Sequence, residues 1–155
     1  MTLLPLEEYY KSLPRKGIGA GVLFFDDEDR ILLVKPNYKQ GWIIPGGSVD
    51  AEESPKEAAI REVREELGLA VSDIALVCVN YTKTYGIKPE AIHFIFSGGV
   101  LSAHHIQNIK LQAEELDEFQ FVSLGDAEKM LAPGFRERVL ACIKQCKSGQ
   151  MVYFE

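Results

Sequence analysis

Residues 54–67 constrain the fold more than any other segment, because the sequence marks both ends of a helix there. Ser54 and Glu57 have the spacing of a capping box, in which each side chain bonds the backbone N–H of the other residue. Pro55 suits the first helical position, and Gly68 suits the left-handed conformation that ends a helix. We therefore predict a helix that begins after Ser54 and ends just before Gly68.

The predicted helix has two different faces. At the helical repeat of about 100° per residue, three carboxylates fall within about 100° of arc, and these are Glu62, Glu65 and Glu66. Apolar residues form a separate stripe that faces the core. The acidic face is either a solvated surface or a site for Mg²⁺ or Mn²⁺, which prefer hard carboxylate oxygens.

Charge and composition limit the partners. The 155 residues carry a net charge of −6, with 46% apolar and 26% charged residues. This composition predicts one domain over residues 1–155, with residues 1–16 as a polar entry segment. A net negative chain does not favour nucleic acid or an anionic membrane surface, so a phosphate ligand needs a local device such as a metal ion. We expect a cytoplasmic protein, because no long apolar run is present and the three cysteines lack disulfide spacing.

The remaining chain alternates strands with short helices. The glycines at 17, 19 and 21 open an apolar strand and are expected to let it approach a ligand or another backbone closely. A mixed sheet with helices on both faces follows from this order. We predict strands over residues 17–25, 31–35, 74–82, 91–100 and 118–122, loops over 83–90 and 101–117, a helical turn over 126–130 and a C-terminal helix over 134–147.

The spacing around the acidic helix resembles a known signature. Gly47 is followed after five residues by Glu53 and after seven more by the run 61–69, Arg-Glu-Val-Arg-Glu-Glu-Leu-Gly-Leu. This pattern is similar to the complete Nudix box of the Nudix hydrolase family. The flanking segments 42–47 and 119–124 also resemble the family, and the likeness extends over about residues 17–147.

The resemblance implies a fold, a reaction and a set of residue roles. The fold would be an α/β/α sandwich around a mixed sheet, and the reaction would be hydrolysis of a nucleoside diphosphate linked to another moiety. Divalent ions, Mg²⁺ or Mn²⁺, would assist that reaction. Glu53 and Arg61 would form an ion pair that holds the loop against the helix. The metal ligands implied are Glu62, Glu65, Glu66 and the backbone carbonyl of Gly47.

The resemblance also implies a general base on the loop before the last strand. Glu115 is the first candidate, and Glu114 and Glu118 are the alternatives. Aromatic side chains are candidates for stacking against a substrate base or sugar. These substrate-binding candidates are Trp42, Tyr38 and Tyr85.

Several functions remain open at this level. The first expectation is a pyrophosphohydrolase acting on a (deoxy)nucleoside triphosphate. The alternatives are a hydrolase of ADP-ribose, another nucleotide sugar or a dinucleoside polyphosphate, and a nucleotide-binding sensor without turnover. No proline stands 15 or 16 residues beyond Leu69, which weakens the ADP-ribose alternative. The expected partner is a nucleotide-type small molecule, and a homodimer is an open expectation.

Overall fold

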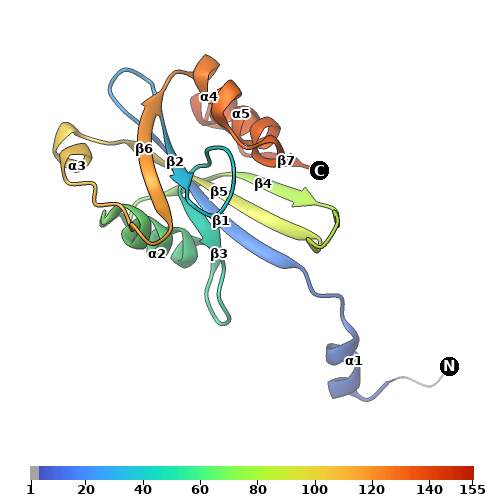
Figure 1. Ribbon diagram of the computed structural model, residues 1–155. Coiled ribbons are helices and arrows are strands. Elements are labelled where there is room, and N and C mark those ends of the chain that lie inside the picture. Colours follow the sequence, from blue (N-terminus) through green and yellow to red (C-terminus); the bar gives the residue numbers. More distant parts are fainter. Residues whose placement is uncertain (1–3) are drawn as a thin grey trace.

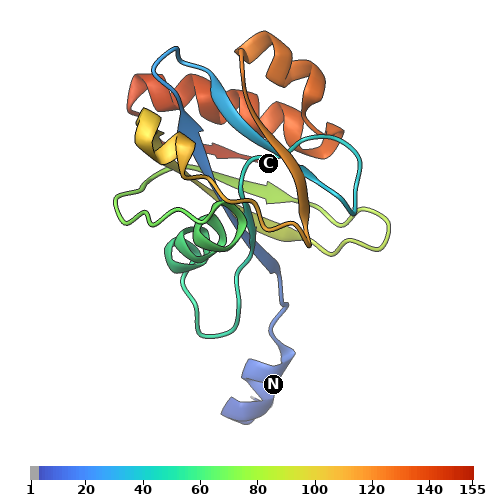
Figure 2. The same cartoon turned by 60° about the vertical axis from the view of Figure 1, so that its left-hand side comes forward.

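The computed structural model describes residues 4–155 and shows a mixed sheet between two helical layers (Figures 1 and 2). The seven-stranded sheet has the order β6-β2-β1-β5-β4-β7, and β3 pairs with β1 outside this path. The elements are α1 (Leu6–Ser12), β1 (Gly17–Phe25), β2 (Ile31–Pro36), β3 (Gly46–Ser48), α2 (Pro55–Leu67), β4 (Ala75–Thr82), β5 (Ala91–Val100), α3 (Ala103–Gln107), β6 (Leu116–Val122), α4 (Leu124–Met130), α5 (Pro133–Ser148) and β7 (Val152–Phe154).

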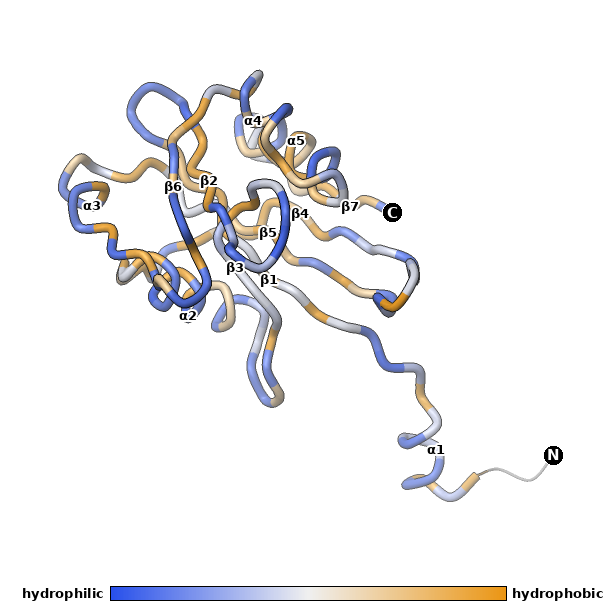
Figure 3. The backbone as a smooth tube through the Cα atoms, viewed as in Figure 1, coloured by the Kyte–Doolittle hydropathy of each residue, from blue (hydrophilic) through white to orange (hydrophobic). Residues whose placement is uncertain are grey.

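Strand β1 shows why both faces of the sheet carry helices. Successive side chains of a strand point to opposite faces. Val22 and Phe24 belong to the core cluster beneath α2, whereas Leu23 and Phe25 belong to the cluster beneath α4 and α5. All four are buried. In Figure 3 the apolar segments accordingly run through the middle of the molecule, between the helices. The predicted α/β/α sandwich with a mixed sheet is confirmed.

The glycines of β1 allow close packing of backbones, as the sequence predicted. β1 pairs parallel with β5 and antiparallel with β2 and β3. In the β3 pairing Gly21 lies opposite Gly46, whose φ of 145° is a conformation that L side chains rarely adopt. A Cβ at Gly46 would overlap the carbonyl oxygen of Ala20. The glycines therefore bring the loop that precedes α2 directly onto the central strand.

Helix α2 has the predicted ends. The Ser54 hydroxyl accepts from the Glu57 N–H at 3.3 Å, and the Glu57 carboxylate accepts from the Ser54 N–H at 2.9 Å. Gly68 ends the helix in the left-handed conformation, with φ of 67°. The predicted apolar stripe is buried at Ala59, Val63 and Leu67. The acidic face is thereby directed toward β3.

Five short elements differ from the prediction. The entry segment contains helix α1, which has no buried residue and projects from the sheet in Figure 1; residues 1–3 of that segment lie outside the described residues. The predicted loop 101–117 was wrong at α3, where Ser102 caps one helical turn, and at the first residues of β6. Neither β3 nor β7 was predicted, and the segment that contains β3 was expected to be a loop. Elements of three to seven residues carry too few side chains for a period to show.

The predicted C-terminal helices are present and begin slightly earlier than expected. Ser123 caps α4 by accepting from the Asp126 N–H at 3.2 Å, and Pro133 occupies the first turn of α5. Within residues 4–155, none of the helices combines the length and apolar content needed to cross a lipid bilayer.

Candidate functional site

Glu62 on α2 lies against the backbone of β3. A Cβ added at Gly47 would stand 2.6 Å from the carboxyl carbon of Glu62, so glycine alone leaves room for this carboxylate. The Glu62 side chain is 15% exposed. Burial raises the pKa of Glu62, although the neighbouring Arg61 guanidinium opposes this effect. The sheet thus holds a carboxylate next to the Gly47 backbone, and the role of both residues as metal ligands stays a prediction.

Glu66 is the most enclosed carboxylate of the acidic face. It is 3% exposed, and its Oε2 accepts a hydrogen bond from the Gly46 N–H at 2.8 Å. Burial raises the pKa of Glu66 to about 8, and the negative charges of Glu62 and Glu115 add to the effect of burial. A buried carboxylate among like charges is stabilised either by a proton or by a nearby cation. This pocket of negative potential therefore favours cation binding.

Arg61 neutralises part of the acidic face. Its Nε and Nη2 bind the two carboxylate oxygens of Glu53 at 2.8 and 3.0 Å, which confirms the predicted ion pair. Its Nη1 also binds Glu62 at 2.8 Å and Glu65 at 3.2 Å. The bidentate contact with Arg61 lowers the pKa of Glu53 to about 2. One guanidinium thus links the loop before α2 to two of the three predicted metal ligands.

The predicted ligands fit a divalent cation in chemistry. Within the described part of the chain, no three carboxylate, imidazole or thiol side chains converge closely enough to hold an ion as they stand. The reason lies in their present partners, because Glu62 and Glu65 bond Arg61 and Glu66 bonds the Gly46 N–H. Their hard oxygens, partial burial and mutual repulsion nevertheless suit Mg²⁺ or Mn²⁺ better than a soft metal.

Among the three candidate bases, the structure brings Glu115 nearest to the acidic face. Its charge raises the pKa of both Glu62 and Glu66. Glu115 is exposed and sits in the turn that precedes β6. The turn is attached to its neighbours through the backbone, since Asn37 N–H donates to the Glu115 carbonyl at 2.9 Å. Glu115 is thus an exposed carboxylate beside the cluster, and its role as a base stays a prediction.

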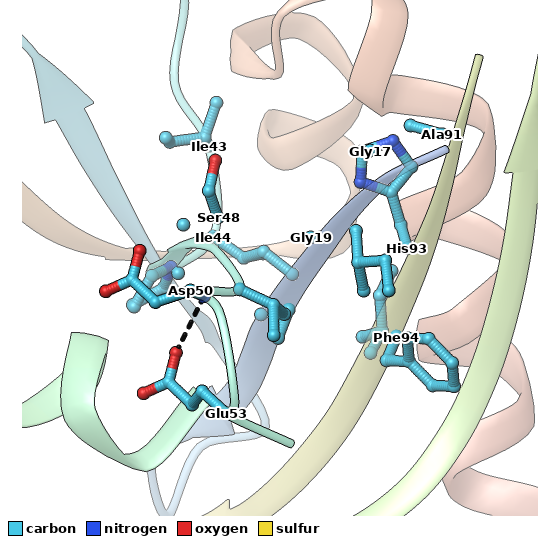
Figure 4. A pocket seen from close by; sticks show the side chains of 18 of the residues that line it. Gly17, Gly19, Ile43, Ile44, Ser48, Asp50, Glu53, Ala91, His93 and Phe94 are labelled. Carbon is cyan, nitrogen blue, oxygen red and sulfur yellow. Dashed lines mark hydrogen bonds between the residues drawn. The ribbon is translucent and has the colours of Figure 1, made fainter. Parts of the chain in front are cut away.

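A cavity of about 740 Å³ opens beside this cluster, between β1, β5, the loop before α2 and α5. Figure 4 shows His93 and Phe94 on one side of it and Asp50 and Glu53 on the other. Tyr38 lines the cavity, as predicted for a substrate-binding aromatic. Burial raises the pKa of Tyr38, and the negative charges of Glu66 and Glu115 act in the same direction. Its contact with substrate stays a prediction.

The other two aromatic candidates are placed elsewhere. Trp42 packs against the core beneath α4 and α5, and its backbone bonds Met130 and Ala132. Tyr85 is 85% exposed in the connection between β4 and β5. Neither lines the cavity. Their predicted contact with substrate therefore finds no support in the structure.

Four cavity residues were missed by sequence reasoning: Lys39, His93, Phe135 and Arg138. His93 reaches the cavity because β5 pairs parallel with β1 and places it opposite Gly19. Arg138 follows Phe135 by one turn of α5, between positions that face the core. A polar residue within an apolar strand or stripe was the available signal, but the partners of that residue depend on pairings distant in sequence.

Comparison with known families agrees with this geometry. The model of the NUDIX domain matches residues 15–142. The chain belongs to the Nudix hydrolase family. The matched Nudix domain contains the box from Gly47 to Leu69, the turn with Glu115 and the cavity wall with Arg138. Nudix proteins typically depend on a divalent metal, which agrees with the chemistry of the acidic face.

Individual Nudix relatives resemble the chain over short stretches or in fold. An RNA pyrophosphohydrolase of Halorhodospira halophila is 39% identical over 58 residues, 37% of this chain and 32% of the relative. Diphosphoinositol polyphosphate phosphohydrolase 2 of Homo sapiens is 49% identical over 45 residues, 28% of this chain and 25% of the relative. These matches span a third or less of the curated relatives. The structure of a MutT protein from Methanosarcina mazei Go1 is 26% identical, with a TM-score of 0.65, over 89% of this chain and 98% of that one.

Proposed function

We propose that this chain is a divalent-metal-dependent pyrophosphohydrolase whose substrate is a (deoxy)nucleoside triphosphate. The observation that supports this most is the position of the Glu62 carboxylate against Gly47 and of the Glu66 carboxylate on the Gly46 N–H, because Gly46 and Gly47 also line the cavity of about 740 Å³. The RNA pyrophosphohydrolase named above supports the class of reaction.

The acidic face would hold the metal through the carboxylates of Glu62, Glu65 and Glu66 and the carbonyl of Gly47. When bound, Mg²⁺ or Mn²⁺ neutralises phosphate charge, polarises the reacting P–O bond and lowers the pKa of the attacking water. Arg61 keeps the loop with Glu53 against α2 and so fixes the backbone at Gly47 relative to Glu62. In this proposal the helix and the loop act as one rigid unit.

Glu115 would accept the proton of the attacking water at its carboxylate. Its exposure in a turn leaves the side chain free to reach a water next to the acidic face. Tyr38 and Lys39 line the cavity together with Gly46 and Gly47, so the rest of the substrate would extend past them into the cavity. A chain with a net charge of −6 repels phosphorylated ligands over most of its surface. In this proposal the ligand binds at the one local site where a metal ion neutralises its charge.

A substrate panel with isotope labelling tests the proposal. Nucleoside triphosphates, ADP-ribose, a nucleotide sugar and a dinucleoside polyphosphate are incubated with Mg²⁺ or Mn²⁺ in H₂¹⁸O, and the products are resolved by mass spectrometry. We expect a nucleoside monophosphate and pyrophosphate from triphosphates, with the label showing which phosphorus is attacked. Preference for ADP-ribose or a dinucleotide would refute the triphosphate assignment. Binding without turnover of any substrate would indicate a sensor.

A further inference from the structure

Arg138 presents unused hydrogen-bond donors at the wall of the cavity. Its Nη1 donates to the Asn80 Oδ1 at 3.0 Å, and its guanidinium carbon lies 4.1 Å from the centre of the Phe135 ring. Its Nε is buried and has no hydrogen-bond partner. Since a guanidinium has five N–H donors, Asn80 and Phe135 fix its plane and leave most of these donors free.

No carboxylate neutralises Arg138 among residues 4–155. Burial lowers the pKa of Arg138. A half-buried cation with unsatisfied donors is costly unless a ligand supplies acceptors. A ligand group with several hydrogen-bond acceptors would therefore fit the cavity wall at Arg138.

Lys39 connects this wall to the acidic face. Its Nζ lies 5.3 Å from the centre of the same Phe135 ring. Burial lowers the pKa of Lys39, with the positive charges of Lys88 and Arg138 adding to it and the negative charge of Glu66 opposing it. The Lys39 ammonium group thus interacts electrostatically with both the Glu66 carboxylate and the Arg138 guanidinium. A substrate with its phosphates at the acidic face would pass Lys39 and reach Arg138 with its base.

The wall around Arg138 suits a flat base better than a second phosphate. Phe135, whose ring lies against the Arg138 guanidinium, and Ile44 line the cavity on the α5 side. Phe94 and Ile43 line it on the α2 side, and Figure 4 labels these two residues and Ile44. Apolar and aromatic walls with a few directed polar groups are typical of sites that bind a flat ligand. A phosphate would have to give up its hydration against these apolar side chains.

We propose that Arg138, held in place by Asn80, recognises the O6 and N7 acceptors of a 6-oxopurine base. This inference rests on the proposed function for the position of the phosphates. Guanine and hypoxanthine present two acceptors on that edge, whereas adenine presents one acceptor and an amino donor that meets the Arg138 donors. Arg138 is thus a residue that determines specificity.

Binding measurements test this inference separately from turnover. Dissociation constants are measured by calorimetry for dIMP, dGMP, 7-deaza-dGMP and dAMP with the wild-type chain and the Arg138→Met and Arg138→Lys variants. The wild type should bind dIMP about 10- to 100-fold more tightly than dAMP, the ratio expected for a bidentate contact. Both variants should reduce the ratio to a few-fold, and 7-deaza-dGMP should bind more weakly than dGMP.

Arg136→Met is the matched control. Arg136 also lies on α5 and is half-buried with an unpartnered Nε, but it does not line the cavity. This control should keep the wild-type preference, and circular dichroism should show that each variant folds. The conservative variant Arg138→Lys keeps the positive charge but lacks the paired N–H donors of a planar guanidinium. It therefore distinguishes bidentate hydrogen bonding from electrostatic attraction.

Each outcome supports or overturns the inference. Equal wild-type affinity for dIMP and dAMP, or equal losses for all bases in Arg138→Met, would overturn it. A base preference in a chain that hydrolyses no triphosphate would support the inference while the proposed function fails.

Discussion

His93 provides a quantitative test of the cavity wall through the pH dependence of stability. Gly19 leaves the space for its imidazole, since a Cβ there would lie 2.7 Å from Nδ1. Thr82 on β4 is its only hydrogen-bond partner within the described residues, at 3.4 Å. Burial lowers the pKa of His93 from 6.5 to about 4, and the nearby positive charge of Arg138 acts in the same direction.

The direction of the effect follows from the lowered pKa. Below pH 6.5 the unfolded chain binds a proton at His93 that the folded chain rejects, so stability is retained above pH 6.5 and is lost as the pH falls toward 4. The shift corresponds to about 2–3 kcal/mol once partial exposure of the ring is allowed for. His93→Gln removes this contribution while retaining a polar side chain.

Urea unfolding at intervals from pH 7.5 to pH 4.5 measures the contribution. The wild type should lose about 2 kcal/mol more than His93→Gln over this interval, because the titrations of the other groups are common to both chains. Arg138→Met should raise the pKa of His93 measured by NMR, since a repelling charge is removed. Equal pH slopes for the wild type and His93→Gln would refute the placement of a neutral His93 in this wall.

The remaining predictions concern the acidic face and its helix. Glu65→Gln and Glu66→Gln should each lower turnover by at least about 100-fold without loss of fold; activity within tenfold of wild type in both would exclude them as metal ligands. Ser54→Ala should lower the free energy of unfolding by about 0.5–2 kcal/mol in a denaturant titration, because the Glu57 N–H loses its acceptor. An unchanged stability would contradict the cap. Glu115→Gln should lower kcat by about 10²- to 10⁴-fold, and a metal titration distinguishes a base, with unchanged metal demand, from a ligand, with a raised demand. If Glu115→Gln, Glu114→Gln and Glu118→Gln all keep the wild-type rate, none of these loop glutamates is the general base.

The predictable parts of the molecule are those encoded within about a dozen neighbouring residues. Helix α2 could be predicted at both ends, because the bonds of Ser54 and the left-handed Gly68 are local. The ion pair between Glu53 and Arg61 followed from the family resemblance and is present. The same local signals were too weak for α1 and α3, which are single short helices.

The cavity wall could not be predicted because it is made by contacts distant in sequence. Arg138 meets Asn80 across 58 positions, and His93 reaches the cavity through the parallel pairing of β5 with β1. Aromatic type alone was also a poor guide, since Trp42 serves the core and Tyr85 is exposed. Which polar group faces a ligand is decided by strand register, and register has no signature in a single segment.

Strand β7 has a consequence for aggregation that its three residues do not suggest. It pairs parallel with β4 at Cys78, Val79 and Asn80 and is the last strand of the sheet, so it replaces the middle of the β4 edge with an edge only three residues long. Open edges are templates for intermolecular strand addition. The pairing between β4 and β7 ends at Asn80, the residue that orients Arg138. The pairing of β4 with β7 therefore has two effects. It limits strand addition between copies of this chain, and it holds the part of β4 that carries Asn80, the hydrogen-bond partner of Arg138.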